Sequence, residues 1–547
     1  LGAGLLGSLQ DLGAAGLTSA ASEMASKGAV GLDIHVDRVP LREPGMEPFE
    51  IMVSESQERM LCVVEPDKLD AMLAICDKWD LHHAVIGTVT ANRRMKIYDG
   101  DELVGDVPVT ALVDDCPMYT LQPAEPETQI YPAPPRRLAQ GLDAAGTLLA
   151  LLGSDNVASR RDYFEQYDCV VGSRTIKRPE QAEAAVLRLG ANDGRFRADG
   201  TTGASVAGSA TRAIATPSDN SGPTIAVSID GSGRRVAADP YRGTIGVVLE
   251  CAANLACVGA EPLGLTNCLN FGNPEKPHIA WQMERSVSGM ADVLRALNVP
   301  VVGGNVSLYN ESGDGPIYPT PVVGMVGSLP DPTVIAGNTF TAGDLAVALI
   351  GPFAPSLAAG ELAKLRGEPL PTRLPDLNLS LHAESLKLVR EAVRAGTVTV
   401  ARDISEGGLA TTLAECCLGG VGATVDVAPL VERLARAAER DPDANGDLAD
   451  TATLAETALF GEGPGGIVIA GKRDALMELS NRARGVGFLA LGSTGGNVLQ
   501  IDGFDDVAAS SEPTPTGAAA VTLKEISLDV PNLQRIHSGA LSERAAS

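Results

Sequence analysis

Residues 10–28, QDLGAAGLTSAASEMASKG, return in altered form as residues 402–420, RDISEGGLATTLAECCLGG. Five positions are identical at one constant spacing, and they pair Asp11 with Asp403, Gly16 with Gly408, Leu17 with Leu409, Glu23 with Glu415 and Gly28 with Gly420. Identities that keep one spacing over a whole segment indicate an internal repeat. The chain is therefore predicted to contain two copies of one structural unit.

The agreement continues downstream of both segments. FEIMVSESQERMLCVV at 49–64 lies opposite TALFGEGPGGIVIAG at 457–471, which aligns Glu55 with Glu462, and HAVIGTV at 83–89 lies opposite LALGSTG at 489–495. The second copy follows a long segment that has no counterpart ahead of the first. If the two copies were once alike, roughly 225 residues precede Leu1 in the complete protein, so we expect this chain to be a C-terminal fragment.

Composition narrows the class of protein. The 547 residues carry a formal net charge of −26, with 44% apolar, 20% charged and 3% aromatic residues, a balance typical of a multidomain globular protein. Nucleic-acid binding is disfavoured, because it needs clustered Lys and Arg or aromatic stacking platforms. The apolar runs are too short to span a membrane, and nine scattered cysteines without zinc spacing suit the cytoplasm. We therefore expect a cytoplasmic protein with neither nucleic acid nor a membrane as partner.

Alternating strand and helix patterns predict an α/β protein. A buried strand over 59–64, a helical stripe over 69–79 and a strand over 84–89 predict a β-α-β unit that covers one side of a sheet. A strand over 224–230, a helix over about 244–258 and a strand over 260–272 repeat this alternation. The proline-rich stretch 120–137 predicts a linker, 191–223 a mobile loop and 506–547 a partly ordered tail.

Asp11 precedes a glycine-rich helix start, and two interpretations are open. An acidic residue at this place can hold Mg²⁺ while free backbone N–H groups face a phosphate. It can also be a simple helix N-cap, with the glycines there for close packing. On this segment alone, the cap is the favoured interpretation.

The polar run SESQER at 54–59 lies between two apolar segments. It presents a carboxylate, hydroxyls and an amide to a polar ligand, or it is a solvated turn. The equivalent run in the second copy, GEGPGG at 461–466, lacks most of this polar set. Because the repeat keeps its pattern without them, Ser56 and Gln57 are predicted to bind a ligand rather than to support the fold.

A third segment, VVGGNVSLYN at 301–310, is a strand that runs into Gly-Gly-Asn. Its backbone N–H groups could approach an anion while Asn305 and Ser307 supply oxygens, or it could be a tight turn between strands. The residues alone do not separate the two. None of the six histidines stands in a nucleophile setting, so none is assigned to catalysis.

Five long strings carry a family resemblance: QDLGAAGL (10–17), VPLREPGMEPFEIMVSESQERML (39–61), LTNCLNFGNPEKP (265–277), VVGGNVSLYNES (301–312) and YPTPVVGMVG (318–327). Through them the chain resembles the large synthetase subunit of the phosphoribosylformylglycinamidine synthases, in its small bacterial form. The resemblance implies duplicated units similar to aminoimidazole ribonucleotide synthetase, each with an N-terminal β-α lobe and a C-terminal α/β lobe. Residues 1–120 would be the C-terminal lobe of the first unit, 121–160 a linker, 161–335 and 336–510 the two lobes of the second unit, and 511–547 a tail.

The resemblance also implies roles for individual residues. Asp11 and Asn305 would contact Mg²⁺, Asn267 and Gly304 would contact ATP, and Glu55, Ser56, Gln57 and Ser307 would contact formylglycinamide ribonucleotide. Asn267 stands where the family often has Asp, which keeps the hydrogen bonding without the charge. The family's catalytic histidine lies in an E-H-C-like motif that this sequence does not contain, so no catalytic residue is assigned.

The implied reaction is an ATP-dependent ligation. The amide oxygen of formylglycinamide ribonucleotide attacks the γ-phosphate of ATP, and ammonia then displaces phosphate to form the amidine. Ammonia would come from a separate glutaminase subunit, and a small bridging subunit would join the two. Without the histidine motif we expect this chain to bind ligands weakly and not to turn over. A non-catalytic nucleotide-binding scaffold is the alternative, whereas single-copy relatives such as thiamine-monophosphate kinase are disfavoured by the tandem repeat.

Overall fold

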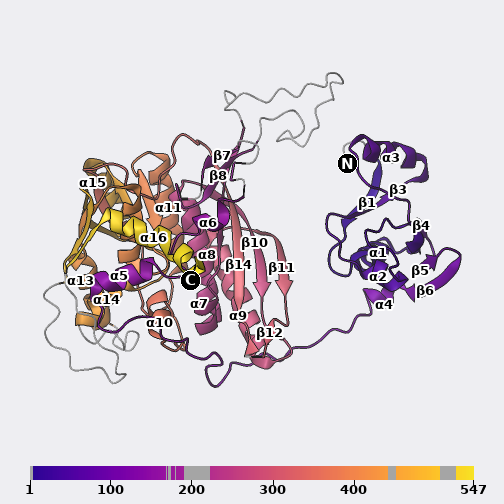
Figure 1. Ribbon diagram of the computed structural model, residues 1–547, viewed down its shortest axis with the longest axis horizontal. Coiled ribbons are helices and arrows are strands. Elements are labelled where there is room, and N and C mark those ends of the chain that lie inside the picture. The colour runs from indigo at the N-terminus through magenta and orange to yellow at the C-terminus, as the bar shows by residue number, and fades with distance from the viewer. Residues whose placement is uncertain are drawn as a thin grey trace. The chain divides into compact units, whose positions relative to one another are not determined.

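The computed structural model describes residues 4–167, 169–170, 174–178, 180–189, 222–313, 315–440, 451–504 and 525–546. They fall into two compact units (Figure 1). Unit 1 is Leu1–Thr120, and unit 2 comprises Leu121–Asp199 and Gly203–Ser547. The predicted mobile loop at 191–223 lies outside the described residues except for its last two positions.

Unit 1 combines a strand pair with a four-stranded sheet. β1 (Leu6–Asp11) pairs antiparallel with β3 (Met60–Val64), and the order of the sheet is β4 (Gly87–Thr90), β2 (Gly31–His35), β5 (Arg94–Asp99), β6 (Glu102–Pro108). Its helices are α1 (Gly16–Gly28), α2 (Pro48–Val53), α3 (Leu69–Lys78) and α4 (Val109–Leu112). Three buried alanines let α1 lie close against the apolar side chains of α2 and the sheet.

The predicted strand, helix and strand at 59–89 are present as β3, α3 and β4. Their predicted assembly is wrong in one respect, because β3 and β4 belong to different sheets. No residue of α3 is fully buried. The helical stripe therefore covers no sheet as a β-α-β unit would, since its apolar side chains are only partly shielded from water.

The first half of unit 2 contains a six-stranded sheet in the order β11 (Val301–Ser307), β10 (Glu261–Asn270), β14 (Thr320–Leu329), β9 (Thr224–Asp230), β8 (Ala185–Arg188), β7 (Thr175–Lys177). Only β10 and β11 are parallel, and β11 is an edge strand. α8 (Pro240–Cys257) packs on β9 and β14, and α9 (Pro277–Leu297) packs on α8 (Figure 1). Short elements α7 (Gly233–Ala238), β12 (Glu311–Ser312) and β13 (Gly315–Pro316) complete this lobe.

The second half of unit 2 is built on a seven-stranded sheet. Its order is β16 (Val400–Asp403), β18 (Ile467–Gly471), β15 (Ala346–Ile350), β19 (Phe488–Thr494), β17 (Ala423–Asp426), β20 (Val498–Asp502), β21 (Ile526–Asp529). Its helices are α10 (Glu361–Arg366), α11 (Leu379–Arg394), α12 (Gly408–Cys416), α13 (Ala428–Arg440), α14 (Thr451–Phe460), α15 (Arg473–Arg482) and α16 (Val530–Ala546). Alternate residues of β15 enter two different hydrophobic cores, so both faces of this sheet are covered.

Two expected connecting segments form part of the second lobe. The expected linker 121–160 contains α5 (Ala144–Leu152), whose Leu148 and Leu151 are fully buried in the core of that lobe. The expected tail 511–547 contains β21, which pairs with β20, and α16, which packs against α5. Prolines and small residues in both segments favoured a linker and a tail, but burial of the apolar faces of α5 and α16 decides the structure.

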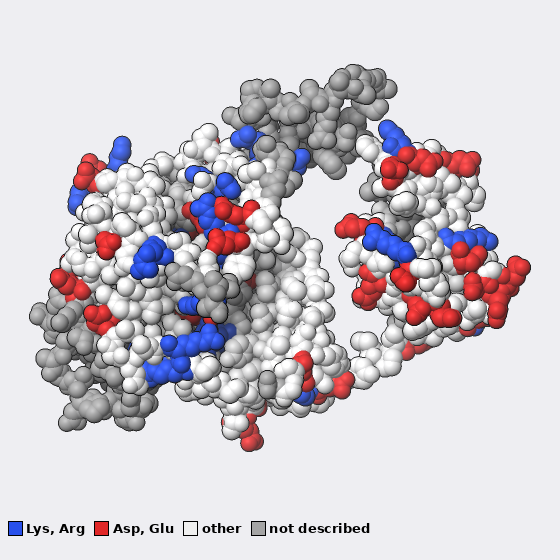
Figure 2. Space-filling view, viewed as in Figure 1, with Lys and Arg blue, Asp and Glu red and all other residues white. Residues whose placement is uncertain are grey.

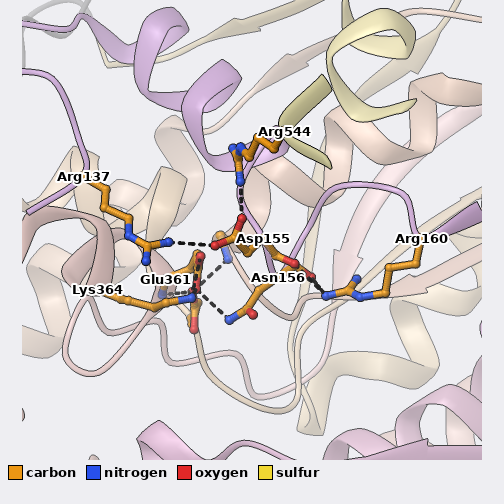
Figure 3. Close-up of polar contacts among 9 residues, drawn as sticks. Arg137, Asp155, Asn156, Arg160, Glu361, Lys364 and Arg544 are labelled. Carbon is orange, nitrogen blue, oxygen red and sulfur yellow. Dashed lines mark hydrogen bonds and ion pairs between the residues drawn. The ribbon is translucent and has the colours of Figure 1, made fainter. Parts of the chain in front are cut away.

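Polar contacts fix the same segments (Figure 3). Asp155, just after α5, accepts from Arg137 Nη1 at 2.8 Å and pairs with Arg544 of α16. Asn156 Nδ2 donates to Glu361 Oε2 at 2.8 Å. A pocket of about 490 Å³ opens beside them, and none of the predicted site residues lines it. In the part of the chain that is described, no helix is both long and apolar enough to cross a membrane.

Candidate functional site

The turn before the helix in each repeat segment, 10–28 and 402–420, has the same unusual backbone. Ala15 and Gly407 are the N-caps of α1 and α12, and both adopt left-handed φ angles, 57° and 82°. The next residues, Gly16 and Gly408, are also left-handed at 53° and 74°. Two consecutive left-handed residues are rare outside glycine. Their recurrence at equivalent positions is structural support for the repeat that the sequence predicts.

The strands that enter these turns also correspond, and their aspartates differ in exposure. Asp11 lies opposite Met60 in the β1–β3 pair, and Asp403 lies opposite Ile467 in the β16–β18 pair. Asp11 is exposed, whereas Asp403 is buried. No side chain caps α1, whose N-cap is Ala15. The capping interpretation of Asp11 is therefore wrong, and its carboxylate accepts no hydrogen bond from the described residues.

The SESQER loop has a fixed backbone and exposed side chains. Arg59 donates from Nε to the carbonyl of Ser56 at 3.0 Å and from Nη2 to the carbonyl of Ser54. Gln57 Nε2 donates to the carbonyl of Glu55 at 3.1 Å, which leaves the amide oxygen of Gln57 for another partner. Glu55, Ser56 and Gln57 are all exposed. The loop thus presents polar groups to solvent from a preset backbone.

One carboxylate in each copy closes the left-handed turn. Glu55 Oε1 accepts from the backbone N–H of Ala15 at 3.0 Å, and Glu462 Oε1 accepts from the N–H of Gly407 at 2.8 Å. Glu462 Oε1 also accepts from the N–H of Glu361 at 2.6 Å. The two carboxylates make the same contact, but Glu55 is exposed and Glu462 is buried.

In unit 2, four predicted residues lie on β10 and the edge strand β11. Asn267 is the register partner of Gly304, where an added Cβ would lie 2.5 Å from Asn267 Oδ1, so glycine there leaves room for the amide. Asn267 Nδ2 also reaches Met290 Sδ at 3.7 Å. The next pair along, Asn305 with Cys268, points to the opposite face, because side chains alternate along a strand. The strand continues through Gly-Gly-Asn, so the tight-turn interpretation is wrong.

Ser307 ends β11, beside the end of β10. Its Oγ lies 3.3 Å from Asn310 Oδ1, and its carbonyl accepts from the N–H of Phe271 at 3.0 Å. Lys276, which follows β10 in the chain, and Glu311, which follows β11, form an ion pair of 2.7 Å. The face of this region seen in Figure 2 is mostly uncharged over β10 and β11. Polar groups at the carboxyl ends of two parallel strands are a common position for ligands in α/β sheets.

The structure groups the predicted residues in two sets. Asp11, Glu55, Ser56 and Gln57 lie together in unit 1, at the β1–α1 turn and the SESQER loop that contacts it. The second set belongs to unit 2 and comprises Asn267, Gly304, Asn305 and Ser307.

The oxygen donors present suit Mg²⁺. Asp11 offers an uncommitted carboxylate among the described residues, and Asn305 uses its Nδ2 toward Cys268, which leaves Oδ1 available. Among the residues described, no group of three or more His, Cys, Asp or Glu side chains could hold a metal by itself. Mg²⁺ typically takes one or two protein ligands and completes its shell with water and phosphate oxygens. Asp11 in unit 1 and Asn305 in unit 2 therefore each offer an oxygen of the kind that Mg²⁺ prefers.

Unit 2 also contains a group of buried charged side chains that was not predicted from the sequence. Arg402 pairs with Glu183 at 3.0 Å and with Glu415 at 2.9 Å, and all three side chains are largely buried. Asp230 accepts from Asn254 Nδ2 at 2.9 Å. The one signal in the sequence was the repeat, which aligns Asp403 and Glu415 of this region with Asp11 and Glu23.

Burial changes the acidity of these groups. Desolvation, with repulsion from Glu406, raises the pKa of Asp230 to about 7. Desolvation also raises the pKa of Glu415 and of Glu462 to about 7, although Arg402 and Arg235 act in the opposite direction. Asp403 has a pKa well above its ordinary value because it is buried near Glu183 and Asp230. In copy two, enclosed carboxyl groups with raised pKa values therefore stand at the positions where copy one exposes Asp11 and Glu55.

Known protein families match both copies. The C-terminal domain of AIR synthase related proteins matches residues 1–100 and again 375–489, and the N-terminal domain of the same proteins matches 211–329. A Phosphoribosylformylglycinamidine synthase subunit PurL from Thermomicrobium roseum is 39% identical over 502 residues, which are 90% of this chain and 62% of the relative. The chain contains the N- and C-terminal domains of AIR synthase related proteins, and it is similar to PurL over most of its length.

Further PurL proteins and PurL structures are similar to this chain over most of its length. PurL from Moorella thermoacetica is 38% identical over 90% of this chain and 61% of its own, and PurL from Anaeromyxobacter dehalogenans (strain 2CP-C) is 42% identical over 75% and 51%. A structure of T. maritima PurL complexed with FGAR has a TM-score of 0.58 at 25% identity, over 90% of this chain and 62% of that one. T. maritima PurL complexed with ATP gives 0.56, also at 25% identity, over 90% and 64%. The chain thus spans from about half to about three fifths of the length of these PurL relatives.

Proposed function

We propose that this chain supplies binding surfaces for formylglycinamide ribonucleotide and ATP to a phosphoribosylformylglycinamidine synthase. The observation that carries the proposal is the SESQER loop. The copy-one loop keeps an exposed Ser56 and Gln57 on a fixed backbone, while the copy-two loop has lost both and is buried around Glu462. A PurL of known structure binds FGAR and another complex binds ATP, which supports the choice of ligands.

The proposed division of roles follows the two groups of residues. In unit 1, Ser56 and Gln57 hydrogen-bond to the substrate, and Ser307 of unit 2 adds a further substrate contact. In unit 2, Asn267 and Gly304 receive the nucleotide. Glu55 is a further proposed substrate contact, and one of its carboxylate oxygens also accepts from the N–H of Ala15.

Asp11 and Asn305 are the proposed Mg²⁺ ligands. Bound Mg²⁺ would neutralise phosphate charge, which is the main requirement of phosphoryl transfer. The chain's own proposed contribution is binding: unit 1 holds the substrate through Ser56 and Gln57, and unit 2 holds the nucleotide through Asn267 and Gly304. Ammonia then displaces phosphate from the activated amide to give the amidine.

The proposed partners are a glutaminase subunit that provides ammonia and a small bridging subunit. A structure of PurLQS from Thermotoga maritima, to which the chain is similar, is consistent with such an assembly. The proposed compartment is the cytoplasm, where the nine free cysteines would stay reduced. Since no position of this chain matches the family's catalytic histidine, we propose binding without turnover for the chain on its own. Amidine formation from ammonia by the 547-residue chain alone would contradict that statement.

Calorimetric titration of the full chain with FGAR tests the proposal directly. Ser56→Ala or Gln57→Ala should weaken FGAR binding by about tenfold, the loss expected for one hydrogen bond to a polar ligand. Ser480→Ala, the same chemical change on helix α15, is the matched control and should leave FGAR affinity unchanged. Equal affinities for wild type, Ser56→Ala and Gln57→Ala would remove the SESQER loop from the proposed site.

A further inference from the structure

We infer that Asn310 is a positioning residue, whose side-chain amide holds the hydroxyl group of Ser307 in place for the substrate. The inference rests on the proposed function, in which Ser307 contacts FGAR. Asn310 lies three residues after Ser307, in the turn that follows the edge strand β11. The conformation of this turn brings the two side chains together.

The amide of Asn310 is bonded to the ends of both parallel strands. Its Nδ2 donates to the carbonyl of Phe271, just after β10, at 3.0 Å, and to the carbonyl of Ser307, at the end of β11, at 2.9 Å. These two carbonyl groups use both N–H bonds of the amide. The Oγ of Ser307 lies 3.1 Å from Nδ2 and 3.3 Å from Oδ1 of the same amide. Asn310 therefore contacts both the backbone and the side chain of Ser307.

The backbone of the turn is fixed as well. The N–H of Asn310 donates to the carbonyl of Phe271 at 3.1 Å, and the carbonyl of Asn310 accepts from the N–H of Ile317 at 3.1 Å. Tyr309 adopts a left-handed φ of 62°, and its N–H donates to the carbonyl of Gly272 at 3.0 Å. A left-handed backbone is unfavourable for a bulky residue and persists where the surrounding contacts determine it. The turn is thus held in a strained conformation that returns the chain to the end of β10.

These contacts make Asn310 a support of the site and leave Ser307 able to bind. Both N–H bonds of the Asn310 amide are used by carbonyl groups, and the residue is half-buried. A serine hydroxyl has one donor and two acceptor positions. It accepts from Nδ2 or donates to Oδ1, so in either case the Ser307 oxygen keeps an acceptor position for a ligand. A hydroxyl held in one rotamer loses less conformational entropy on binding than one that rotates freely.

A double-mutant cycle in the full chain tests the inference, with calorimetry as the measure of FGAR affinity. Ser307→Ala should weaken FGAR binding by about tenfold, the loss of one hydrogen bond to a polar ligand, and Asn310→Ala should weaken it by no more than that. Because Asn310 acts through Ser307, Asn310→Ala should have no further effect in the Ser307→Ala chain. Losses that multiply in the double variant would show that Asn310 acts on the ligand independently of Ser307, and would overturn the inference.

Two further variants define the chemistry of the contact. Asn310→Asp keeps the size of the side chain but replaces the Nδ2 donor with an oxygen that faces two carbonyl groups. It should weaken FGAR binding at least as much as Asn310→Ala, and wild-type affinity would contradict the role of the amide. Asn481→Ala is the matched control, because this exposed amide on α15 donates only to the carbonyl of Met477 among the described residues. It should leave FGAR affinity unchanged.

ATP affinity separates positioning of Ser307 from general support of the sheet. The proposed nucleotide contacts, Asn267 and Gly304, lie earlier on β10 and β11. Asn310→Ala should therefore leave ATP affinity unchanged while FGAR affinity falls. An equal loss of affinity for both ligands would show that Asn310 supports the whole strand pair, and would overturn the inference.

Hydrogen–deuterium exchange without ligand distinguishes failure of this inference from failure of the proposed function. Asn310→Ala should speed exchange of the backbone N–H groups of Phe271 and of residues 309–310 by about tenfold, whereas Ser307→Ala should leave it unchanged. Wild-type exchange rates in Asn310→Ala would overturn the inference, whatever happens to FGAR binding. If the wild-type chain does not bind FGAR at all, the proposed function fails, while the exchange data still decide whether Asn310 holds Ser307 and its turn.

Discussion

Gly16 is the position where the shape of unit 1 is most sensitive to a single added methyl group. Its φ of +53° is left-handed, and a Cβ there would lie 2.0 Å from the carbonyl oxygen of Ser54 and 3.2 Å from that of Met52. The left-handed conformation costs alanine roughly 1–2 kcal/mol. Overpacking against backbone atoms that cannot rotate away adds roughly 1–3 kcal/mol. Gly16→Ala should therefore destabilise unit 1 by about 3 kcal/mol.

Native-state hydrogen exchange measured at the amides of α1 and β3 is the suitable assay, because it reports unit 1 separately from unit 2. A loss of about 3 kcal/mol should reduce protection there by about a hundredfold. Gly13→Ala is the matched control in the same turn, since Gly13 is not left-handed and an added Cβ would have no atom within 4 Å. It should change stability by less than about 0.5 kcal/mol. Equal protection of these amides in Gly16→Ala and Gly13→Ala would show that the backbone around Gly16 has room for a Cβ, and would refute the reasoning.

Three further predictions concern unit 2, and urea unfolding measures each of them. The pKa of Asp230 is raised to about 7 in the folded state, whereas an aspartate in the unfolded chain loses its proton near pH 4. The folded state therefore binds one more proton between these pH values, and this group lowers the free energy of unfolding as pH rises from about 4 to about 7. Asp230→Asn should remove up to about 1.4 kcal/mol per pH unit from that slope, and an unchanged slope between pH 5 and 7 would contradict the pKa. Arg402→Met should cost about 3–5 kcal/mol because it leaves the buried carboxylates of Glu183 and Glu415 unpaired, and a cost below about 1 kcal/mol would show that they are solvated. Leu148→Ala should cost about 2–5 kcal/mol, whereas a neutral effect would mean that α5 is a linker after all.

The repeat was the most informative feature of the sequence, and it was readable because it is a local pattern. Matching glycines, an aspartate and a glutamate recur at fixed spacing, and the same C-terminal domain of AIR synthase related proteins matches both places. Strands and helices with clear apolar periodicity, such as β9 and α8, were also predictable. These are properties of neighbouring residues, so the order of amino acids alone determines them.

Segments stabilised mainly by distant contacts were not predictable in the same way. α5 and α16 looked like a linker and a tail, but each gains its stability by burying an apolar face against the other and against the second lobe. The sequence pattern predicted that β3 and β4 belong to one β-α-β unit, but in the structure they lie in different sheets. Strand pairing depends on which edges meet in space, which a local pattern does not encode.

The sequence by itself determined that the chain contains two copies of one unit, that both copies keep a glutamate in the loop at Glu55 and Glu462, and that only the first copy keeps Ser56 and Gln57. Tertiary structure alone decided what these residues do. It brought Glu55 to the N–H of Ala15, and it exposed Asp11 while it buried Asp403. It also placed Asn267 and Asn305 on opposite faces of one sheet. The physical reason is that hydrogen bonds across 40 or more residues and the burial of a carboxyl group depend on the packing of the whole unit, whereas a repeat depends only on spacing along the chain.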